Sequence, residues 1–249
     1  MPSFILDLDG VLRRGNHVIE GAQDLLTTMD DYMIVTNNST RTSEMYSEEL
    51  SHIGLSISPD NIFTSAMATA LFLKKNRDYA TAWVVGEMGL LQEIRRIGLT
   101  ITEDCECVVV GWDRTLTFEK LATACLAIRG GAEFIGTNPD LTYPSEKGII
   151  PGCGSILAFL TACTNVNPLV IGKPHPLIME LALKRLKSKP CYIVGDRLDT
   201  DIQAGINAHL KTILVLTGVE TRESLQSSQI KPDFVFENLK DLRESITRL

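Results

Sequence analysis

Two aspartates interrupt an apolar stretch near the start of the chain. The stretch "FILDLDGVL" covers residues 4–12, and Asp7 and Asp9 lie among residue types that favour a buried strand. A buried, unpaired carboxylate is costly, and it normally avoids that cost by pairing with a cation, binding a metal ion or taking up a proton. Aspartate is also disfavoured inside strands. The two acids therefore indicate chemistry rather than packing.

Three later apolar runs also end on polar residues. These runs are "YMIVTNN", "PLVIGKPHP" and "CYIVGDRLDTD", and their polar residues are Thr36, Asn37 and Asn38 in the first, Lys173 in the second, and Asp196, Asp199 and Asp201 in the third. Ligands of open α/β sheets bind beyond the carboxyl ends of the strands. If these runs are neighbouring strands, acids suited to a divalent ion meet a hydroxyl, amides and an ammonium suited to phosphate oxygens.

Each motif taken singly has a plain structural alternative. Thr-Asn-Asn after a strand is typical of a turn and a helix cap. Gly-Lys-Pro is typical of a turn followed by a helix start, and Asp199 and Asp201 are acids of the kind favoured at a helix N-terminus. The joint occurrence of such residues at four strand ends favours the functional interpretation.

The elements that would position these residues alternate along the chain. The expected strands are "SFILDL", "YMIVTN", "AWVVG", "CVVVGW", "EFIGTN", "PLVIG", "CYIVGD", "KTILVLTG" and "DFVFEN", and the segments with helical spacing are 67–75, 89–97, 118–128 and 176–186. This alternation predicts an α/β fold with a doubly wound, parallel sheet. Two short runs flank Gly15-Asn16, which predicts a small hairpin flap after the first strand.

Composition and charge narrow the class of protein. The chain has 249 residues, 44% hydrophobic and 22% charged, as in globular proteins, and it contains no apolar run of the roughly 20 residues that span a bilayer. The first expected strand begins beside Met1 and leaves no room for a signal peptide, which predicts a cytoplasmic protein. A net charge of −7 argues against a nucleic acid polymer as partner. A small anionic substrate would need local positive charge.

The cysteines do not form a recognisable metal motif. They are Cys105, Cys107, Cys125, Cys153, Cys163 and Cys191. Only the first two are close in sequence, and no histidine pair at ligand spacing accompanies them, which argues against zinc. We expect buried, reduced thiols.

The polar motifs together resemble a known family. "DLDGVL", "VTNN", "GKP" and "VGDRLDTDI" resemble, in the same order, the four signature motifs of the haloacid dehalogenase (HAD)-like hydrolases. Residues 10–35 leave little room between the first two motifs, whereas residues 37–172 leave much more before the third. An insertion at that place resembles subfamily IIA, which has an α/β cap of the C2 type and includes NagD-like and 4-nitrophenylphosphatase-like phosphatases. "TSAMATA", "VVGEMGL", "GTNPD" and "LTGV" extend the similarity along nearly the whole chain.

The resemblance implies two domains and a set of roles. A Rossmann-like catalytic core would comprise 1–78 and 168–249, and a smaller cap domain, 79–167, would set substrate specificity. Asp7 matches the nucleophile that forms an aspartyl-phosphate. Asp9 matches the general acid that protonates the leaving alcohol and then activates water.

The resemblance also implies a metal ion and a phosphate site. Mg²⁺ would be held by Asp7, the backbone carbonyl of Asp9 and Asp196, while Asp201 would orient water or Lys173. Thr36 and Lys173 would bind the transferring oxygens, with Asn37 and Asn38 helping through amides. Asp199 has no clear implied role, and a solvent-facing helix cap is the alternative.

Other residues are candidates for substrate contact. "TNPDLTYPSEKGIIPGCGS" is expected to be a long polar loop of the cap, with Asn138, Asp140 and Tyr143 as candidates. Tyr143 either stacks on a ring of the substrate or has a structural role. Arg13, Arg14 and Arg197 could reach the phosphate rim, although a solvated arginine is the default for each.

The predicted function is Mg²⁺-dependent hydrolysis of small phosphate monoesters. The substrate could be a nucleoside monophosphate, a sugar phosphate, phosphoglycolate or an aryl phosphate. A phosphotransferase or phosphomutase would share every core residue. A phospho-acceptor signalling domain also uses acids, a hydroxyl and a lysine, but the long second lobe argues against it. A dehalogenase has no need of Asp9. The resemblance further implies a possible homodimer formed through the cap.

Overall fold

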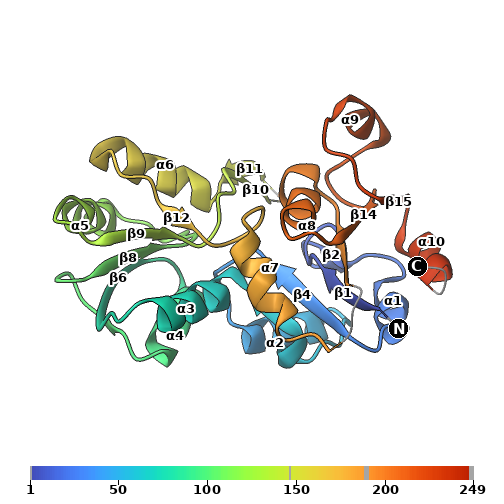
Figure 1. Cartoon of the computed structure of the whole chain (residues 1–249), viewed down its shortest axis with the longest axis horizontal. Helices are drawn as coiled ribbons and strands as arrows, with labels where there is room; N and C mark the ends of the chain where they lie inside the picture. The colour runs from blue at the N-terminus through green and yellow to red at the C-terminus, as the bar shows by residue number, and fades with distance from the viewer. Residues whose placement is uncertain (1, 146, 188–190, 247–249) are drawn as a thin grey trace. The chain divides into compact units, whose positions relative to one another are not determined.

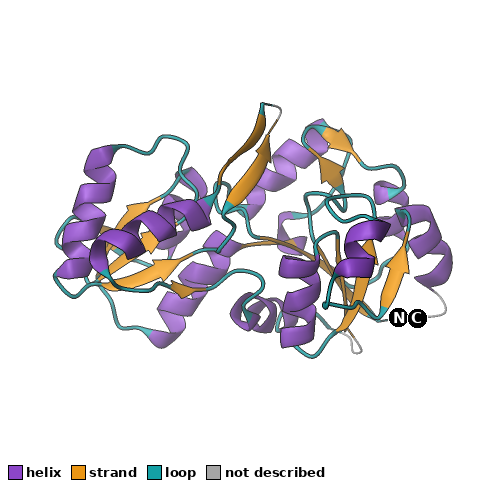
Figure 2. Ribbon diagram, turned by 90° about the horizontal axis from the view of Figure 1, so that it is seen from above, coloured by secondary structure: helices purple, strands orange, loops and turns teal. Residues whose placement is uncertain are grey.

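The computed structural model describes residues 2–145, 147–187 and 191–246, and this part of the chain forms two compact units. Unit 1 comprises Met1–Thr36, Tyr46–Phe63 and Lys173–Leu249, and unit 2 comprises Asn37–Met45 and Thr64–Gly172. The expected cap, 79–167, lies within unit 2, which also takes in 37–45, 64–78 and 168–172. The functional division into core and cap stays a prediction. The predicted α/β class is confirmed, because parallel strands and helices build both units (Figure 2).

Unit 1 is built on a sheet with β1 near its centre. The strand order is β15 (Phe234–Phe236), β14 (Lys211–Val215), β13 (Cys191–Gly195), β1 (Ser3–Leu6), β4 (Tyr32–Thr36) and β5 (Ile62–Thr64). Leu6 pairs in parallel with Val194 on one side and Ile34 on the other. The carboxyl ends of β1, β4 and β13 therefore lie together at one edge of the sheet (Figure 1).

Helices cover this sheet, and a small hairpin follows β1. The helical segments are α1 (Ala22–Thr27), α2 (Ser43–His52), η1 (Pro59–Asn61), α7 (Pro176–Leu183), the π-helical η2 (Leu198–Ile202), α8 (Gln203–Asn207), α9 (Arg222–Ser227) and α10 (Leu239–Ser245). The predicted flap is confirmed as β2 (Arg13–Arg14) paired with β3 (His17–Val18). Gly15 has φ +57°, the left-handed conformation that this turn requires.

Unit 2 has its own parallel sheet. Its strand order is β12 (Leu169–Val170), β9 (Glu133–Gly136), β8 (Cys107–Val110), β6 (Thr81–Val85) and β7 (Thr100–Ile101). The helices are α3 (Ser65–Asn76), α4 (Met88–Arg96), α5 (Phe118–Arg129) and α6 (Cys153–Thr164). Valines of β8 and side chains of α5 and α6 form its apolar core. Strands buried between helices explain the near-continuous apolar runs in the sequence.

The segment 142–151 differs from the expected polar loop. It forms an antiparallel hairpin of β10 (Thr142–Ser145) and β11 (Gly148–Pro151), in which Thr142 pairs with Pro151. The residues of β11 are mostly exposed, and each strand of the hairpin contains a proline, Pro144 in β10 and Pro151 in β11. Because proline is disfavoured in strands, the sequence of this segment is typical of a loop.

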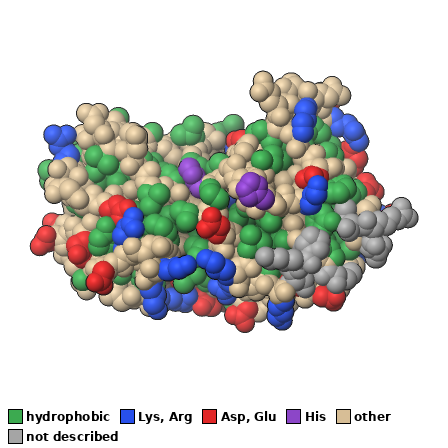
Figure 3. Space-filling view, in the orientation of Figure 1, with side chains coloured by type: hydrophobic (Ala, Val, Ile, Leu, Met, Phe, Trp, Pro, Cys, Tyr) green, Lys and Arg blue, Asp and Glu red, His purple; other side chains and the backbone are tan. Residues whose placement is uncertain are grey.

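The helices and the charged surface agree with the composition of the chain. Among the residues described, no helix combines the length and apolar character needed to cross a bilayer. Both signs of charge are present on the face of the molecule shown in Figure 3.

Candidate active site

The carboxyl ends of the strands of unit 1 bring together residues from all four motifs. Asp7 directly follows β1 and continues its ladder, since its N–H donates to Val194 O at 2.9 Å. Thr36 ends β4 and is buried, and Asp196 directly follows β13. The π-helical turn η2 then brings Asp201 to the same place. Strand pairing thus brings together acids that are far apart in sequence.

Lys173 joins two of these acids. Its Nζ donates to Asp7 Oδ1 at 2.5 Å, to Asp201 Oδ1 at 2.7 Å and to Val35 O at 2.9 Å. The lysine side chain is only 3% exposed. Burial by itself would lower the pKa of Lys173, but the charges of Asp201 and Asp7 raise it above its ordinary value. The ammonium is therefore a fixed positive charge at this edge.

The acids outnumber this cation. Burial and the charge of Asp201, against the opposing effect of Lys173, raise the pKa of Asp7 to about 7. Burial and the charges of Asp201 and Asp7 also raise the pKa of Asp196 well above its ordinary range. One ligand oxygen from each of Asp7, Asp196 and Asp201 lies within 4.8 Å of the others. Such a cluster is stabilised by an additional positive charge.

One carboxylate oxygen of Asp196 is buried without a hydrogen-bond partner among the residues described. Its Oδ2 accepts from the N–H of Val219 at 2.8 Å, whereas its buried Oδ1 has no hydrogen-bond partner within the described ranges. Backbone packs closely around the carboxylate: a Cβ on Gly10 would lie 2.2 Å from Oδ2, and one on Gly218 would lie 1.8 Å from it. Hard divalent cations prefer oxygen ligands, and the three carboxylates supply them, including the Asp196 oxygen that has no hydrogen-bond partner in the described part of the chain. The residues present therefore fit a divalent metal ion.

Asp9 is held by an arginine that the sequence interpretation placed in solvent. Arg13 is buried, and its Nε donates to Asp9 Oδ1 at 2.9 Å while its Nη1 donates to Glu49 Oε1 at 2.9 Å. The guanidinium also lies 5.5 Å from the ring centre of Tyr46. The expectation of a solvated Arg13 is wrong, because α2 supplies an acid and an aromatic ring that enclose it. Glu49 and Tyr46 were missed, since no local pattern connects α2 with the hairpin.

The other two arginines lie at the surface. Arg14 is exposed, and its Nη2 donates to Thr217 O at 2.6 Å. Arg197 pairs with Asp199 through Nη2 and Oδ2 at 2.9 Å, and the Asp199 side chain is 65% exposed. The position of Asp199 agrees with the solvent-facing alternative, in contrast to the buried Asp201.

Asn37 and Asn38 take part in hydrogen bonds within unit 2. Asn37 Nδ2 donates to Asp140 Oδ2 at 3.1 Å, and Asn138 Nδ2 donates to Asn37 O at 2.8 Å. Asn38 Oδ1 accepts from the N–H of Thr40 at 3.0 Å, as in an Asx turn. Three of the predicted substrate candidates thus form one network of amides and a carboxylate, and their contact with substrate stays a prediction.

The remaining cap candidate, Tyr143, packs against an aromatic neighbour. Its ring lies 4.3 Å from that of Trp112 at an angle of 35°, and Trp112 Nε1 donates to Pro151 O at 2.9 Å. This arrangement supports the structural alternative for Tyr143.

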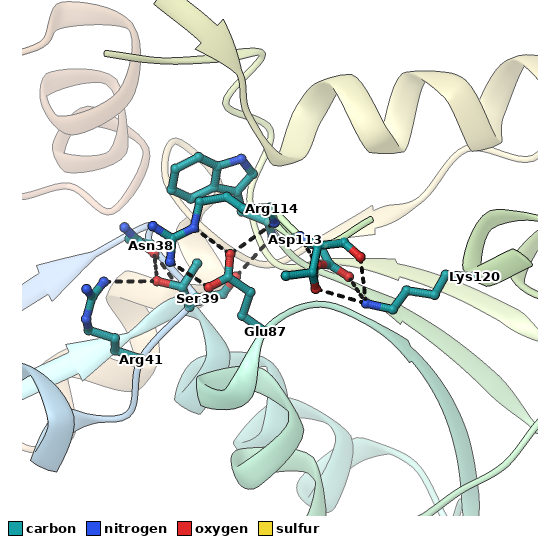
Figure 4. A network of polar contacts seen from close by, with 10 residues as sticks. Asn38, Ser39, Arg41, Glu87, Asp113, Arg114 and Lys120 are labelled. Atoms are coloured by element: carbon teal, nitrogen blue, oxygen red, sulfur yellow. Dashed lines mark hydrogen bonds and ion pairs between the residues drawn. The ribbon is translucent and has the colours of Figure 1, made fainter. Parts of the chain in front are cut away.

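A second polar network in unit 2 was not predicted from sequence. Figure 4 shows it around Asp113, Glu87, Arg114 and Lys120. Asp113 accepts from Lys120 Nζ at 2.7 Å, and Arg114 Nη2 donates to Glu87 Oε2 at 2.7 Å. These pairs satisfy the polar groups of the segment that follows β8.

Comparison with known proteins gives the family. Residues 4–100 match the family model described as haloacid dehalogenase-like hydrolase, and residues 170–242 match a related HAD-hydrolase-like model. The 5'-nucleotidase YutF of Bacillus subtilis is 41% identical over 96% of this chain and 96% of its own length. An acid sugar phosphatase of Staphylococcus saprophyticus is 39% identical over 99% of this chain and 97% of its own length.

Solved structures agree with this assignment. The 4-nitrophenylphosphatase of Thermotoga maritima has a TM-score of 0.94 and 35% identity, with 99% of this chain and 97% of that chain covered. NagD from Escherichia coli has a TM-score of 0.89 and 33% identity, with 96% and 98% covered. The glycerol phosphate phosphatase of Mycobacterium tuberculosis, solved in complex with magnesium, has a TM-score of 0.92 and 32% identity, with 97% and 77% covered.

The chain therefore belongs to the haloacid dehalogenase-like hydrolases. Within that family it is a NagD-like phosphatase, a phosphoric monoester hydrolase, as the resemblance of its four motifs predicted.

Proposed function

We propose that this enzyme hydrolyses small phosphate monoesters through an aspartyl-phosphate formed on Asp7, with Mg²⁺ as its metal ion. The observation that carries the proposal is the buried contact of Lys173 Nζ with Asp7 Oδ1 and Asp201 Oδ1, beside an Asp196 oxygen that has no partner among the residues described. Catalysis of phosphoryl transfer is mostly positioning and neutralisation of charge. This cluster supplies a nucleophile, a fixed cation and ligands for a second cation.

Asp7 must attack phosphorus as a carboxylate. A phosphate monoester repels an anionic nucleophile, and Lys173 offsets that repulsion because its ammonium contacts Asp7 directly. Attack of an Asp7 oxygen on phosphorus forms an acyl phosphate and releases the alcohol, and water then hydrolyses the acyl phosphate. Thr36, buried at the end of β4, would bind a transferring oxygen.

The metal ion would be held by Asp7, Asp196 and the backbone carbonyl of Asp9, with Asp201 orienting Lys173. When bound, Mg²⁺ supplies positive charge that neutralises the phosphate oxygens. The fit rests on the oxygen ligands of the cluster and on the unpartnered Asp196 Oδ1. The mycobacterial relative, solved in complex with magnesium and in complex with calcium, supports a divalent metal ion.

Asp9 would act as acid and then as base. Arg13 contacts Asp9 through Oδ1, so Oδ2 is the oxygen that would carry the proton to the leaving alcohol. The Asp9 side chain is 32% exposed, which gives it access to substrate and water. Arg13 is itself fixed by Glu49 on α2, and we assign it the role of a positioning residue.

The substrate class follows from the relatives' names. They include a nucleotidase, a sugar phosphatase, a glycerol phosphate phosphatase and a 4-nitrophenylphosphatase. These enzymes share a phosphate monoester and differ in the alcohol, so we propose a small phosphorylated metabolite as substrate. The network of Asn37, Asn138 and Asp140 is the proposed source of polar contacts. Homodimer formation through the cap and a cytoplasmic location stay predictions.

The test is phosphate release from a panel of nucleoside, sugar, glycerol and aryl monophosphates. Each is assayed with Mg²⁺ and after chelation, using the wild type and Asp7→Asn. We expect turnover that requires Mg²⁺ and is lost in Asp7→Asn. Near-normal turnover by Asp7→Asn would overturn the mechanism. Adding glycerol as a competing acceptor separates hydrolysis from transfer, because a phosphotransferase would yield glycerol phosphate instead of inorganic phosphate.

A further inference from the structure

Two cysteines of unit 2 meet at the surface between neighbouring helices. Cys125 lies on α5 and Cys163 on α6, and their Sγ atoms are 3.3 Å apart. Figure 1 shows α5 and α6 side by side, and the two helices are in contact. Cys163 is exposed and Cys125 is half-buried, so the expectation of buried thiols is wrong for this pair.

The packing of α5 against α6 keeps the two sulfur atoms close together. Arg129, one turn after Cys125 on α5, donates from Nη1 to the backbone carbonyl of Cys163 at 3.1 Å. The inner face of α5 is anchored by buried Leu121 and Ile128, and that of α6 by buried Leu160. Because both cysteines lie on packed helices, their proximity is a feature of the fold and not of one loop conformation.

A disulfide suits this pair better than a soft metal ion. Structural zinc sites use four ligands, usually cysteine and histidine. Within the described part of the chain, the group of His, Cys, Asp and Glu side chains that could hold a metal is Asp7, Asp196 and Asp201, which does not include this pair. The sulfur atoms need to approach by about 1.3 Å to reach the disulfide bond length of about 2.05 Å.

We propose that Cys125 and Cys163 are a reversible thiol–disulfide site whose oxidant is a low-molecular-weight disulfide such as oxidised glutathione. The exposed Cys163 thiolate attacks one sulfur of the oxidant, the S–S bond breaks, and one thiolate leaves and takes up a proton. Cys125 then attacks Cys163 Sγ in the mixed disulfide and releases the second thiol. In sum, two protein thiols and one small disulfide give one protein disulfide and two small thiols.

The reaction should be faster at alkaline pH. Partial loss of solvation and the contact with Cys125 raise the pKa of the exposed Cys163 thiol above its ordinary value, against the opposing effects of a backbone hydrogen bond and of Arg129. The thiolate is the attacking species, so its fraction at neutral pH limits the first step. The observed rate of oxidation should increase as pH rises from 7 to 9.

The experiment uses the whole reduced chain incubated with oxidised glutathione. We expect a loss of about 2 Da on intact mass measurement, and proteolysis without reduction should yield a peptide containing Cys125 linked to one containing Cys163. Dithiothreitol should reverse both changes. The cross-link closes a long loop between α5 and α6, so the melting temperature of the oxidised protein should be about 5 °C higher than that of the reduced protein.

Matched variants decide between outcomes. Cys125→Ser should stop at a stable mixed disulfide on Cys163, and Cys163→Ser should give no internal link, whereas Cys105→Ser should oxidise like the wild type. A wild-type product carrying glutathione alone, a link that involves Cys105 or Cys107, or a dimer joined through Cys163 would each overturn the proposal. Protection of both thiols by Zn²⁺ at stoichiometric concentration would overturn it in favour of a metal site.

Discussion

Two buried aspartates, Asp113 in unit 2 and Asp196 in unit 1, have opposite surroundings. Asp113 accepts from Lys120 Nζ at 2.7 Å and from the N–H and hydroxyl of Thr115 at 2.8 and 2.7 Å (Figure 4). Although burial opposes it, hydrogen bonds from Lys120 and Thr115 hold the pKa of Asp113 below its ordinary value. This carboxylate has all the partners that a structural ion pair needs.

Asp196 has fewer partners and more competing charge. One oxygen is bonded to a backbone N–H, the other has none within the described residues, and the pKa is raised by burial and by Asp201 and Asp7. A folded chain tolerates such an arrangement where a ligand completes it. An oxygen without a hydrogen-bond partner among the described residues and the neighbouring negative charges therefore distinguish Asp196 from the buried but fully hydrogen-bonded Asp113.

The largest effect is expected for the nucleophile. Asp7→Asn should reduce phosphate release about a thousandfold or more, because an amide cannot form the acyl phosphate. The folded state should persist, since the substitution removes one of several crowded negative charges. Steady-state kinetics and circular dichroism of the same preparation check both statements. An inactive variant with a lost thermal transition would instead indicate misfolding.

Replacement of Lys173, the ammonium shared by two acids, should reduce both activity and stability. Lys173→Met leaves Asp7 and Asp201 without their common partner. We expect turnover to fall about a hundredfold and the free energy of unfolding to fall by about 3–5 kcal/mol, the typical cost of breaking a buried ion pair. Urea denaturation measures the second quantity. Unchanged stability would show that the cluster does not depend on this ammonium.

The two aspartates provide a direct comparison. Asp113→Asn should lower the free energy of unfolding by about 1–3 kcal/mol with little change in turnover, because it weakens hydrogen bonds within unit 2 and removes none of the proposed catalytic groups. Asp196→Asn should abolish Mg²⁺ dependence of the melting temperature and leave the metal-free protein as stable as the wild type, or more so. Equal destabilisation by both substitutions would contradict the contrast drawn between them.

Arg13 should have a smaller, substrate-dependent effect. Arg13→Met removes the contact that orients Asp9, and we expect turnover of an alkyl phosphate to fall about tenfold, or about 1.4 kcal/mol. Turnover of 4-nitrophenyl phosphate should fall less, since its leaving group needs little protonation. A purely structural role would reduce turnover of both substrates equally, and Arg13→Lys should restore part of the difference.

The smallest of the expected effects is the change with pH in the stabilisation of the protein by Mg²⁺. The pKa of Asp7 in the folded, metal-free chain is raised from 3.8 to about 7, so its contribution to stability is fully present below pH 3.8 and is lost as pH rises through 7. Added Mg²⁺ should therefore raise the melting temperature more at pH 7.5 than at pH 5, by a few degrees. Calorimetry at both pH values measures this, and an equal shift would argue against Asp7 as a ligand.

The gathering of Asp7, Lys173 and Asp196 could be predicted from the sequence because the ends of the strands are recognisable in it. Apolar runs that stop at Asp7 and Asp196 predict where parallel strands terminate, and the pairing of β1 with β13 brings these ends together. The hairpin flap was likewise readable from Gly15-Asn16. These features depend on local pattern and on one rule of sheet topology.

Other features depend on contacts that no local pattern encodes. The burial of Arg13 requires Glu49 and Tyr46 on α2, and the close approach of Cys125 to Cys163 requires the packing of α5 on α6. The β10–β11 hairpin was expected to be a loop, because Pro144 and Pro151 interrupt its strands and β11 is mostly exposed. The burial and the contacts of such residues are set by the packing of elements that are distant in sequence.

The place of β1 in its sheet has a consequence for biosynthesis. The first strand, β1, is paired on one side with Tyr32–Thr36, which is made soon after it. On the other side it is paired with Cys191–Gly195, which is made only after residues 64–172 of unit 2. A nascent chain that has reached Gly172 carries Asp7 but lacks Lys173, Asp196 and Asp201. Long-range pairing of this kind is slow and leaves a strand edge open meanwhile. The cluster of Asp7, Lys173, Asp196 and Asp201 therefore cannot assemble in a nascent chain before β13 and η2 have been made.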